Sequence, residues 1–376
     1  MDKVKKYLFA LLLIGLLIPA IQNRIKFMNV KPLYGSFNVE ALPKYSWSSW
    51  FLGTFQPALE VALDQNMLIR PAFVRLNNQL NYSLFNLANA KSVVIGKEGY
   101  LFEEGYINSY LGHDGVNEGA IKLKIEKAKY VQRELEKRGK HLLILLVPGK
   151  ASYYSEYIPD RYLSEGKKTS YYDLFSKHLP GSGLNYIDLK GYFLKMKNKT
   201  PFPLYPKQGV HWSSYGATLA MDSIINYIKY DFKIDVPTMT INEIDTPIET
   251  RDSDYDIGDG MNLILKMSHN QMGYPKIKFD TDTNKIRPNV LTIGDSHFWT
   301  LIGFGLNKNV FKNNAFWYYN KIAYVAPYKE APVNPYNLRK EIDSQDIIIL
   351  LQTEVYYNNI GMGFIESAYS LYKNNW

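Results

Sequence analysis

The chain has 376 residues, a net charge of +8 and no cysteine, so disulfides, thiolate nucleophiles and cysteine-bound zinc are excluded. Its 44 Lys and Arg against 36 Asp and Glu are spread along the sequence, which suits an anionic partner such as an acidic polysaccharide or phospholipid headgroups. The sequence has no basic block and no nucleic-acid-reading motif, so we do not expect it to bind nucleic acid.

The N-terminus has the pattern of an export signal. Three lysines within the first six residues precede an apolar run over 7–21. The run is shorter than the roughly 20 residues usual for a membrane span. Ile18 and Ala20 make a poor cleavage site, so residues 1–24 are predicted to be a retained signal anchor, with a cleaved signal peptide as the alternative. The positive-inside rule then places the body of the protein outside the cytoplasm, anchored to the inner membrane.

Residues 25–90 are predicted to form a juxtamembrane aromatic and helical arm, with a helical stretch over 57–87 that Pro71 interrupts. From residue 91 onward, apolar runs alternate with amphipathic stretches. The pattern predicts strands over 93–95, 142–147, 186–189, 290–293 and 347–351, and helices over 118–138, 173–178, 215–228 and 298–311. Such alternation indicates a three-layer α/β fold with a mainly parallel sheet over 91–376. The charged residues 231–289 interrupt the pattern and are predicted to be an insertion.

A candidate nucleophile follows one of these strands. The strand over 290–293 stops at Gly294-Asp295-Ser296, which places Ser296 at the carboxyl end of the sheet, where open α/β folds hold their sites. A serine hydroxyl needs a neighbouring base, and His211, followed by Trp212, is the best candidate. Asp295 is predicted mainly to cap the turn.

These residues resemble the SGNH hydrolase-like proteins of the alginate O-acetyltransferase type, the AlgX and AlgJ group. The resemblance rests on Gly294-Asp295-Ser296, on His211-Trp212, and on two further runs, 94–102 and 147–159, in a shared order over about residues 90 to 355. It implies an SGNH-like fold and a periplasmic, membrane-linked serine enzyme that transfers acetyl groups to hydroxyls of an exported polysaccharide. It also implies that a multi-pass membrane-bound O-acyltransferase supplies the acetyl group.

The chain departs from that family at one position. The family motif has an aspartate two residues before the histidine, and here that residue is Gly209. The carboxylate of a serine triad holds the histidine tautomer and stabilises the imidazolium. Three explanations remain open: Glu354 or Asp188 replaces the carboxylate, a serine–histidine dyad suffices, or the protein is non-catalytic.

Two alternative functions therefore stand beside the transferase: a non-catalytic polysaccharide-binding or assembly subunit, and a carbohydrate acetylesterase that uses the same residues with water. No cofactor and no metal site are expected. The four aspartates at 252, 254, 256 and 259 resemble a calcium loop, but Ile257 replaces the required glycine, so the run is interpreted as a solvated acidic turn.

Overall fold

The computed structural model describes residues 2–35, 39–325, 329–334 and 337–374. The chain divides into two compact units, one of Met1–Lys91 with Gly258–Met267 and one of Ser92–Ile257 with Ser268–Trp376. The predicted boundaries at 24 and 90, and the insertion at 231–289, remain predictions.

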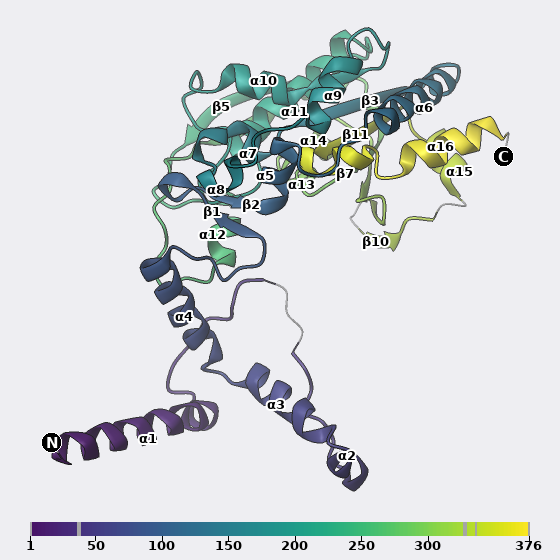
Figure 1. Ribbon diagram of the computed structural model, residues 1–376. Helices are drawn as coiled ribbons and strands as arrows, with labels where there is room; N and C mark the ends of the chain where they lie inside the picture. The colour runs from purple at the N-terminus through teal and green to yellow at the C-terminus, as the bar shows by residue number, and fades with distance from the viewer. Residues whose placement is uncertain (1, 36–38, 326–328, 335–336, 375–376) are drawn as a thin grey trace. The chain divides into compact units, whose positions relative to one another are not determined.

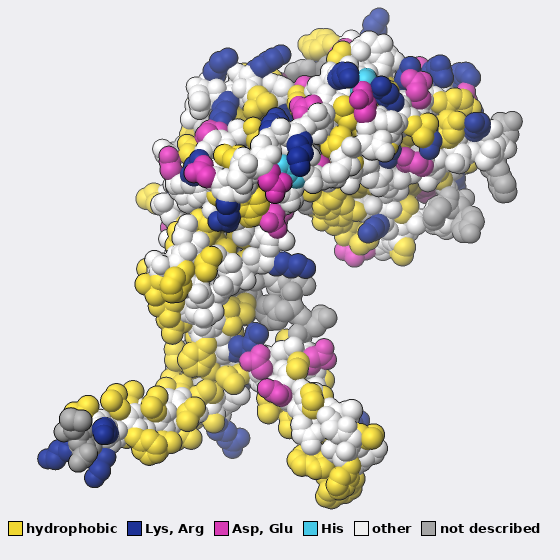
Figure 2. Space-filling view, viewed as in Figure 1, with side chains coloured by type: hydrophobic (Ala, Val, Ile, Leu, Met, Phe, Trp, Pro, Cys, Tyr) yellow, Lys and Arg dark blue, Asp and Glu magenta, His cyan; other side chains and the backbone are white. Residues whose placement is uncertain are grey.

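The first unit is helical and rich in exposed apolar side chains. It contains α1 (Asp2–Ile25), α2 (Trp47–Phe51), α3 (Phe55–Asn66) and α4 (Arg70–Phe85). The α1 helix is long and apolar enough to cross a membrane. The predicted interruption of the helical arm is present, and Pro71 lies in the first turn of α4, where a missing N–H costs least. Hydrophobic side chains cover α1 and α2 in Figure 2.

The second unit is built on a seven-stranded sheet in the order β10-β9-β8-β7-β11-β3-β4. Figure 1 labels four of these strands, β3, β7, β10 and β11. The strands are β3 (His141–Val147), β4 (Tyr186–Asp188), β7 (Asn289–Gly294), β8 (Asn313–Tyr318), β9 (Ile322–Val325), β10 (Lys329–Pro332) and β11 (Ile347–Thr353). The five strands from β8 to β4 are parallel, whereas β9 and β10 are antiparallel. The prediction of a mainly parallel sheet is confirmed.

Helices cover both faces of this sheet. On one face, α6 (Glu118–Glu136), α9 (Tyr171–His178), α15 (Leu338–Asp343) and α16 (Phe364–Lys373) share one buried core with alternate residues of the strands. The intervening strand residues, such as Leu143 and Ile349, are also fully buried. Outside that core, α10 (Leu189–Met196), α11 (Ser214–Tyr230) and α14 (Leu306–Asn309) contact β3, β4 and β8. The result is the predicted three-layer arrangement.

The remaining elements are short. They are β1 (Val93–Ile95), β2 (Leu101–Glu103), α5 (Glu104–Leu111), α7 (Lys150–Tyr153), α8 (Asp160–Leu163), β5 (Met239–Asp245), α12 (Asp256–Gly260), β6 (Tyr274–Phe279) and α13 (Phe298–Gly303). Among them, β1 pairs with β2 and β5 pairs with β6 in two separate two-stranded sheets. The helix predicted over 298–311 is two helices, because Gly305 adopts a φ of +88° between α13 and α14. The strands β8, β9 and β10 and the helix α10 were not predicted.

Candidate active site

Ser296 lies at the carboxyl end of the parallel sheet, directly after β7. Gly294 ends that strand, and a Cβ atom at this position would lie 2.9 Å from the carbonyl oxygen of Leu351 in β11. The close approach of the two strands therefore requires glycine. The chain then turns into α13, and the N–H of Trp299 donates to the carbonyl of Ser296 at 3.2 Å. This turn leaves the Ser296 side chain at the carboxyl edge of the sheet.

His211 lies in the loop that leads into α11. Ser213 caps that helix, since its hydroxyl oxygen accepts a hydrogen bond from the N–H of Gly216 at 2.9 Å. The same hydroxyl donates to the carbonyl of Pro203 at 2.7 Å, which ties the start of the helix to the preceding loop. The cap therefore fixes the backbone two residues after His211.

Lys150 holds the same loop from the other side. Its side chain is buried, and its Nζ donates to the carbonyls of Lys207 and Gly209 at 2.7 and 2.8 Å. Burial holds the pKa of Lys150 well below its ordinary value. Lys150 was not predicted to be part of the site, although it belongs to the run 147–159 that carried the family resemblance.

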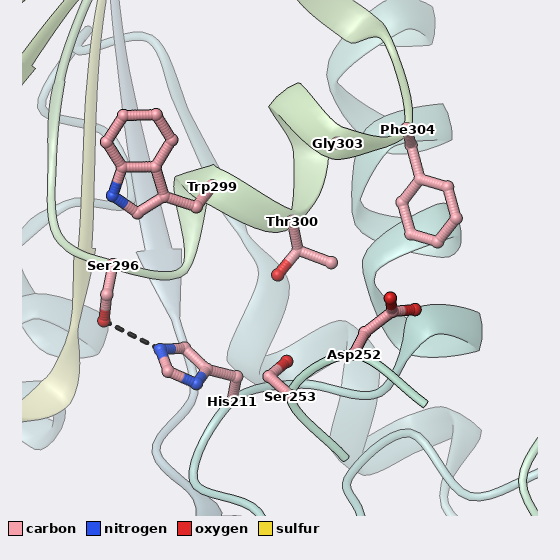
Figure 3. A pocket seen from close by; sticks show the side chains of 8 residues that line it. All are labelled: His211, Asp252, Ser253, Ser296, Trp299, Thr300, Gly303 and Phe304. Atoms are coloured by element: carbon pink, nitrogen blue, oxygen red, sulfur yellow. Dashed lines mark hydrogen bonds between the residues drawn. The ribbon is translucent and has the colours of Figure 1, made fainter. Parts of the chain in front are cut away.

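A chain of hydrogen bonds joins Ser296, His211 and Asp256. His211 Nε2 lies 2.8 Å from Ser296 Oγ (Figure 3), and His211 Nδ1 lies 2.6 Å from Asp256 Oδ2. The other oxygen of the carboxylate accepts from the N–H groups of Val210 and Ile257 at 2.9 and 2.7 Å. A carboxylate can only accept, so Nδ1 carries the proton and Nε2 accepts the serine hydroxyl. This is the tautomer that a serine nucleophile requires.

The electrostatics of the site favour a basic imidazole. Burial by itself disfavours the charged form of His211, but the hydrogen bond and negative charge of Asp256 outweigh it and raise the pKa above its ordinary value. The charges of Asp295 and Glu103 act in the same direction. The arrangement can therefore take a proton from Ser296 and stabilise the imidazolium that results.

The packing around Gly209 explains why the carboxylate comes from elsewhere in the chain. A Cβ atom on Gly209 would lie 2.4 Å from the carbonyl oxygen of Ser253 and 3.1 Å from the backbone of Asp254. The segment that carries Asp256 thus occupies the space that an aspartate at position 209 would need. The two arrangements exclude each other, and this chain has the second one.

The interpretation of the aspartate run as a solvated turn is wrong. Asp254 is only 1% exposed, and Asp256 is bonded to His211. Burial raises the pKa of Asp254 to about 7, and the nearby charges of Asp252 and Asp256 add to the effect. The run itself was the only sequence signal for Asp256. Within the described residues, no group of three or more His, Asp or Glu side chains is placed to hold a metal ion.

The two carboxylates predicted as the third member lie elsewhere. Glu354 is buried after β11, where it forms an ion pair with Lys190 and accepts a hydrogen bond from the N–H of Gly149 at 2.7 Å. Asp188 caps α10 by accepting from the N–H of Gly191 at 2.8 Å. Both side chains lie where a strand ends, and the hydrogen bonds described here join them to residues other than His211. The prediction that one of them replaces the missing aspartate is therefore corrected to Asp256.

Two other motif residues, Asp295 and Trp212, are buried and are not among the residues that line the pocket described below. Asp295 is fully buried, and its carboxylate accepts from the N–H of His297 at 3.0 Å and from the N–H of Thr353 at 2.7 Å. Despite its burial, these bonds and the neighbouring His297 hold the pKa of Asp295 below its ordinary value. Trp212 is also fully buried, and its ring lies 5.4 Å from that of His297. Asp295 thus joins the serine turn to β11.

A pocket of about 390 Å³ opens beside Ser296 and His211. Figure 3 shows Trp299 and Thr300 of α13 on one side and Phe304 and Asp252 farther from the serine. Its volume lies within the roughly 300–1,000 Å³ common for small-molecule sites. The serine–histidine pair is therefore accessible to a substrate.

Residues 93–259 match the model of the SGNH hydrolase-like domain of the acetyltransferase AlgX. This part of the chain is thus similar to the SGNH hydrolase-like domain of the AlgX/AlgJ type. The family resemblance predicted from the sequence is thereby confirmed. The matched segment includes His211 and Asp256 and ends before Ser296.

Among known proteins, the chain is 28% identical over 186 residues to the probable alginate O-acetylase AlgJ of Pseudomonas aeruginosa. That match covers 49% of this chain and 45% of AlgJ, so this chain spans less than half of that relative. The solved O-acetyltransferase domain of Pseudomonas putida AlgJ is 16% identical with a TM-score of 0.45, over 76% of this chain and 99% of that one. The structure of Pseudomonas aeruginosa AlgX is 12% identical with a TM-score of 0.45, over 73% and 67% of the two chains.

Proposed function

We propose that this protein is an O-acetyltransferase that acetylates hydroxyls of an exported polysaccharide through an acyl-serine intermediate on Ser296. The observation that carries the proposal is the hydrogen-bonded chain from Ser296 through His211 to Asp256. The AlgX-type domain and the AlgJ relative support acetyl transfer as the reaction and a polysaccharide as the acceptor.

The proposed reaction has two similar halves. His211 Nε2 takes the proton of Ser296 as Oγ attacks the acetyl carbonyl, and the imidazolium returns that proton to the leaving group of the donor. A sugar hydroxyl then attacks the acyl-serine, gives its proton to His211, and Ser296 leaves with that proton. Asp256 stabilises the imidazolium in both halves. The backbone N–H of Ser296, at the turn into α13, is the proposed donor to the oxyanion.

The proposed location is the periplasmic, extracytoplasmic face of the inner membrane. Three lysines precede the apolar part of α1, which favours a cytoplasmic N-terminus and an exported body. A multi-pass membrane-bound O-acyltransferase is the proposed partner that delivers the acetyl group. The anchor would keep the AlgX-type domain close to that partner and to the growing polymer.

Two other functions remain to be distinguished. An acetylesterase would use the same three residues with water as the acceptor, and the open pocket beside Ser296 admits water as well as a sugar. A non-catalytic binding or assembly subunit was motivated by Gly209, and the contact between Asp256 and His211 weighs against it.

The test is the intact mass of the full chain in detergent after exposure to p-nitrophenyl acetate. We expect one acetyl adduct that is absent from Ser296→Ala and strongly reduced in His211→Ala. Ser164→Ala is the matched control, because Ser164 is an exposed serine outside the pocket whose hydroxyl donates to the carbonyl of Arg161. An adduct that persists in Ser296→Ala would refute the acyl-serine mechanism.

A chase then identifies the acceptor. The acyl-enzyme is mixed with an oligosaccharide, and both acetate and acetylated sugar are measured. Transfer to sugar supports the transferase. Acetate release at a rate that the oligosaccharide does not change would identify an esterase instead.

A further inference from the structure

The pocket beside Ser296 combines flat apolar surfaces with a few polar groups. Trp299 and Phe304 line it, together with the Thr300 hydroxyl and the Asp252 carboxylate (Figure 3). Such a combination is typical of sites that hold a ring by its apolar face and orient it by its hydroxyls. A pyranose ring has this chemistry.

The Trp299 side chain is held in place from behind. Its indole makes edge contacts with Phe316 of β8 at 4.9 Å and with Tyr324 of β9 at 4.8 Å between ring centroids. These contacts come from two neighbouring strands of the sheet, so the orientation of the indole is set before a substrate arrives. A pre-oriented aromatic surface lowers the entropy cost of binding a ring.

Asp252 gives this pocket a negative side chain, opposite in sign to the net charge of the whole chain. Among the described residues that line the pocket, Asp252 is an exposed carboxylate and none is Lys or Arg. Asp256 lies just behind His211, and the charges of Asp252 and Asp256 add to the burial that raises the pKa of Asp254. The net charge of +8, which suits an anionic partner overall, therefore does not describe the place where the reaction is proposed to occur.

We propose that the pocket formed by Trp299, Phe304 and Asp252 holds an uncharged sugar residue of the acceptor and discriminates against uronic acid residues. This inference rests on the proposed function and specifies its substrate class. The Asp252 carboxylate accepts hydrogen bonds from sugar hydroxyls, and it repels a sugar carboxylate brought into the same pocket. The acceptor residue is therefore of a different class from the uronate units of an acidic polysaccharide.

The test uses acyl-enzyme prepared from the full chain in detergent with p-nitrophenyl acetate. The acyl-enzyme is mixed with tetra-N-acetylchitotetraose (called chitotetraose below), which is uncharged because its amines are acetylated, or with tetragalacturonate at the same concentration. The loss of the adduct and the acetylation of each sugar are followed by mass spectrometry. We expect chitotetraose to accept acetyl at least about tenfold faster than tetragalacturonate, the effect of about 1.4 kcal/mol of repulsion.

Asp252→Asn tests the origin of that ratio. Asn tolerates the left-handed backbone of residue 252, where φ is +53°, so the fold should be retained. We expect the ratio of the two sugars to fall to about threefold or less. Asp282→Asn is the matched control, since Asp282 is an exposed aspartate outside the pocket, and its ratio should equal that of the unmodified protein.

The outcomes separate this inference from the proposed function. Failure to form the acyl adduct refutes the proposed function itself. An adduct that passes to tetragalacturonate as fast as to chitotetraose, or a ratio that Asp252→Asn leaves unchanged, overturns the acceptor inference alone. An adduct that neither sugar removes faster than water does also overturns it and favours the esterase.

Discussion

Replacing Asp256 by asparagine is the sharpest test of the site. The substitution keeps the size of the side chain and an oxygen that can accept from the N–H of Val210, but it removes the negative charge 2.6 Å from His211 Nδ1. The amide can also donate to Nδ1, which favours the tautomer with the proton on Nε2, where it cannot accept from the serine. Acylation of Ser296 should therefore slow sharply.

The size of the effect follows from the geometry. Two unit charges about 4 Å apart interact by about 4 kcal/mol at an effective dielectric constant of about 20, which suits side chains that are 18% and 17% exposed, as His211 and Asp256 are. This energy corresponds to roughly a thousandfold in rate. Loss of the correct tautomer brings the expected loss to about 10³- to 10⁴-fold.

The assay is the pre-steady-state release of p-nitrophenol from p-nitrophenyl acetate by the full chain in detergent. Asp259→Asn is the control, because Asp259 is exposed on the same helix, α12, and should leave the rate within about twofold. Thermal unfolding of each variant shows whether the fold is retained. If Asp256→Asn remains folded and acylates within tenfold of the unmodified protein, the carboxylate is not part of the catalytic machinery.

Three further predictions concern the surroundings of this carboxylate. Gly209→Ala should lower the free energy of unfolding in urea by about 3 kcal/mol, because its Cβ would lie 2.4 Å from the carbonyl oxygen of Ser253. Gly260→Ala is the control and should not destabilise the fold, because the space at its Cβ position is open. Acylation needs neutral His211, whose pKa is raised, so the acylation rate should fall as the pH drops through that raised value. Asp256→Asn should move this fall in rate to lower pH. A fall that stays at the same pH contradicts the assignment. Asp254 has its pKa raised from 3.8 to about 7, so the folded state loses stability as pH rises between these values. Asp254→Asn should therefore be more stable than the unmodified protein by an amount that grows over this pH range and reaches up to about 4 kcal/mol above pH 7. The melting temperatures of both proteins across this range measure the effect, and a difference that does not change with pH would contradict it.

Much of the fold could be predicted from local patterns. The helix α6 has its buried residues at spacings of three and four, and Asn117 caps its start, so its position follows from the sequence alone. The buried strands β3, β7 and β11 were apparent as continuous apolar runs. The strands β9 and β10 were not, because they are four residues long and largely exposed, which leaves little hydrophobic pattern.

Part of the candidate site was also predictable. Ser296 was identified because a strand that ends in Gly-Asp-Ser places its serine at the edge of the sheet. His211 was identified because a serine needs a base and because His211-Trp212 resembles the family motif. The structure places their reactive atoms 2.8 Å apart although 85 residues separate them in the chain. The third residue was predicted wrongly, since Glu354 and Asp188 also lie at strand ends but bond to other partners.

The sequence by itself determined that the chain has an apolar N-terminal helix and a mainly parallel α/β sheet, and it identified a serine and a histidine as the candidate site. These features follow from local patterns, in which burial and turn formation involve neighbouring residues. Only the tertiary structure decided which carboxylate serves His211. That choice depends on the segment around Ser253, which packs against Gly209 and brings Asp256 to the imidazole across 45 residues of chain. Such a contact depends on how distant segments pack together, so no periodicity or motif in the local sequence predicts it.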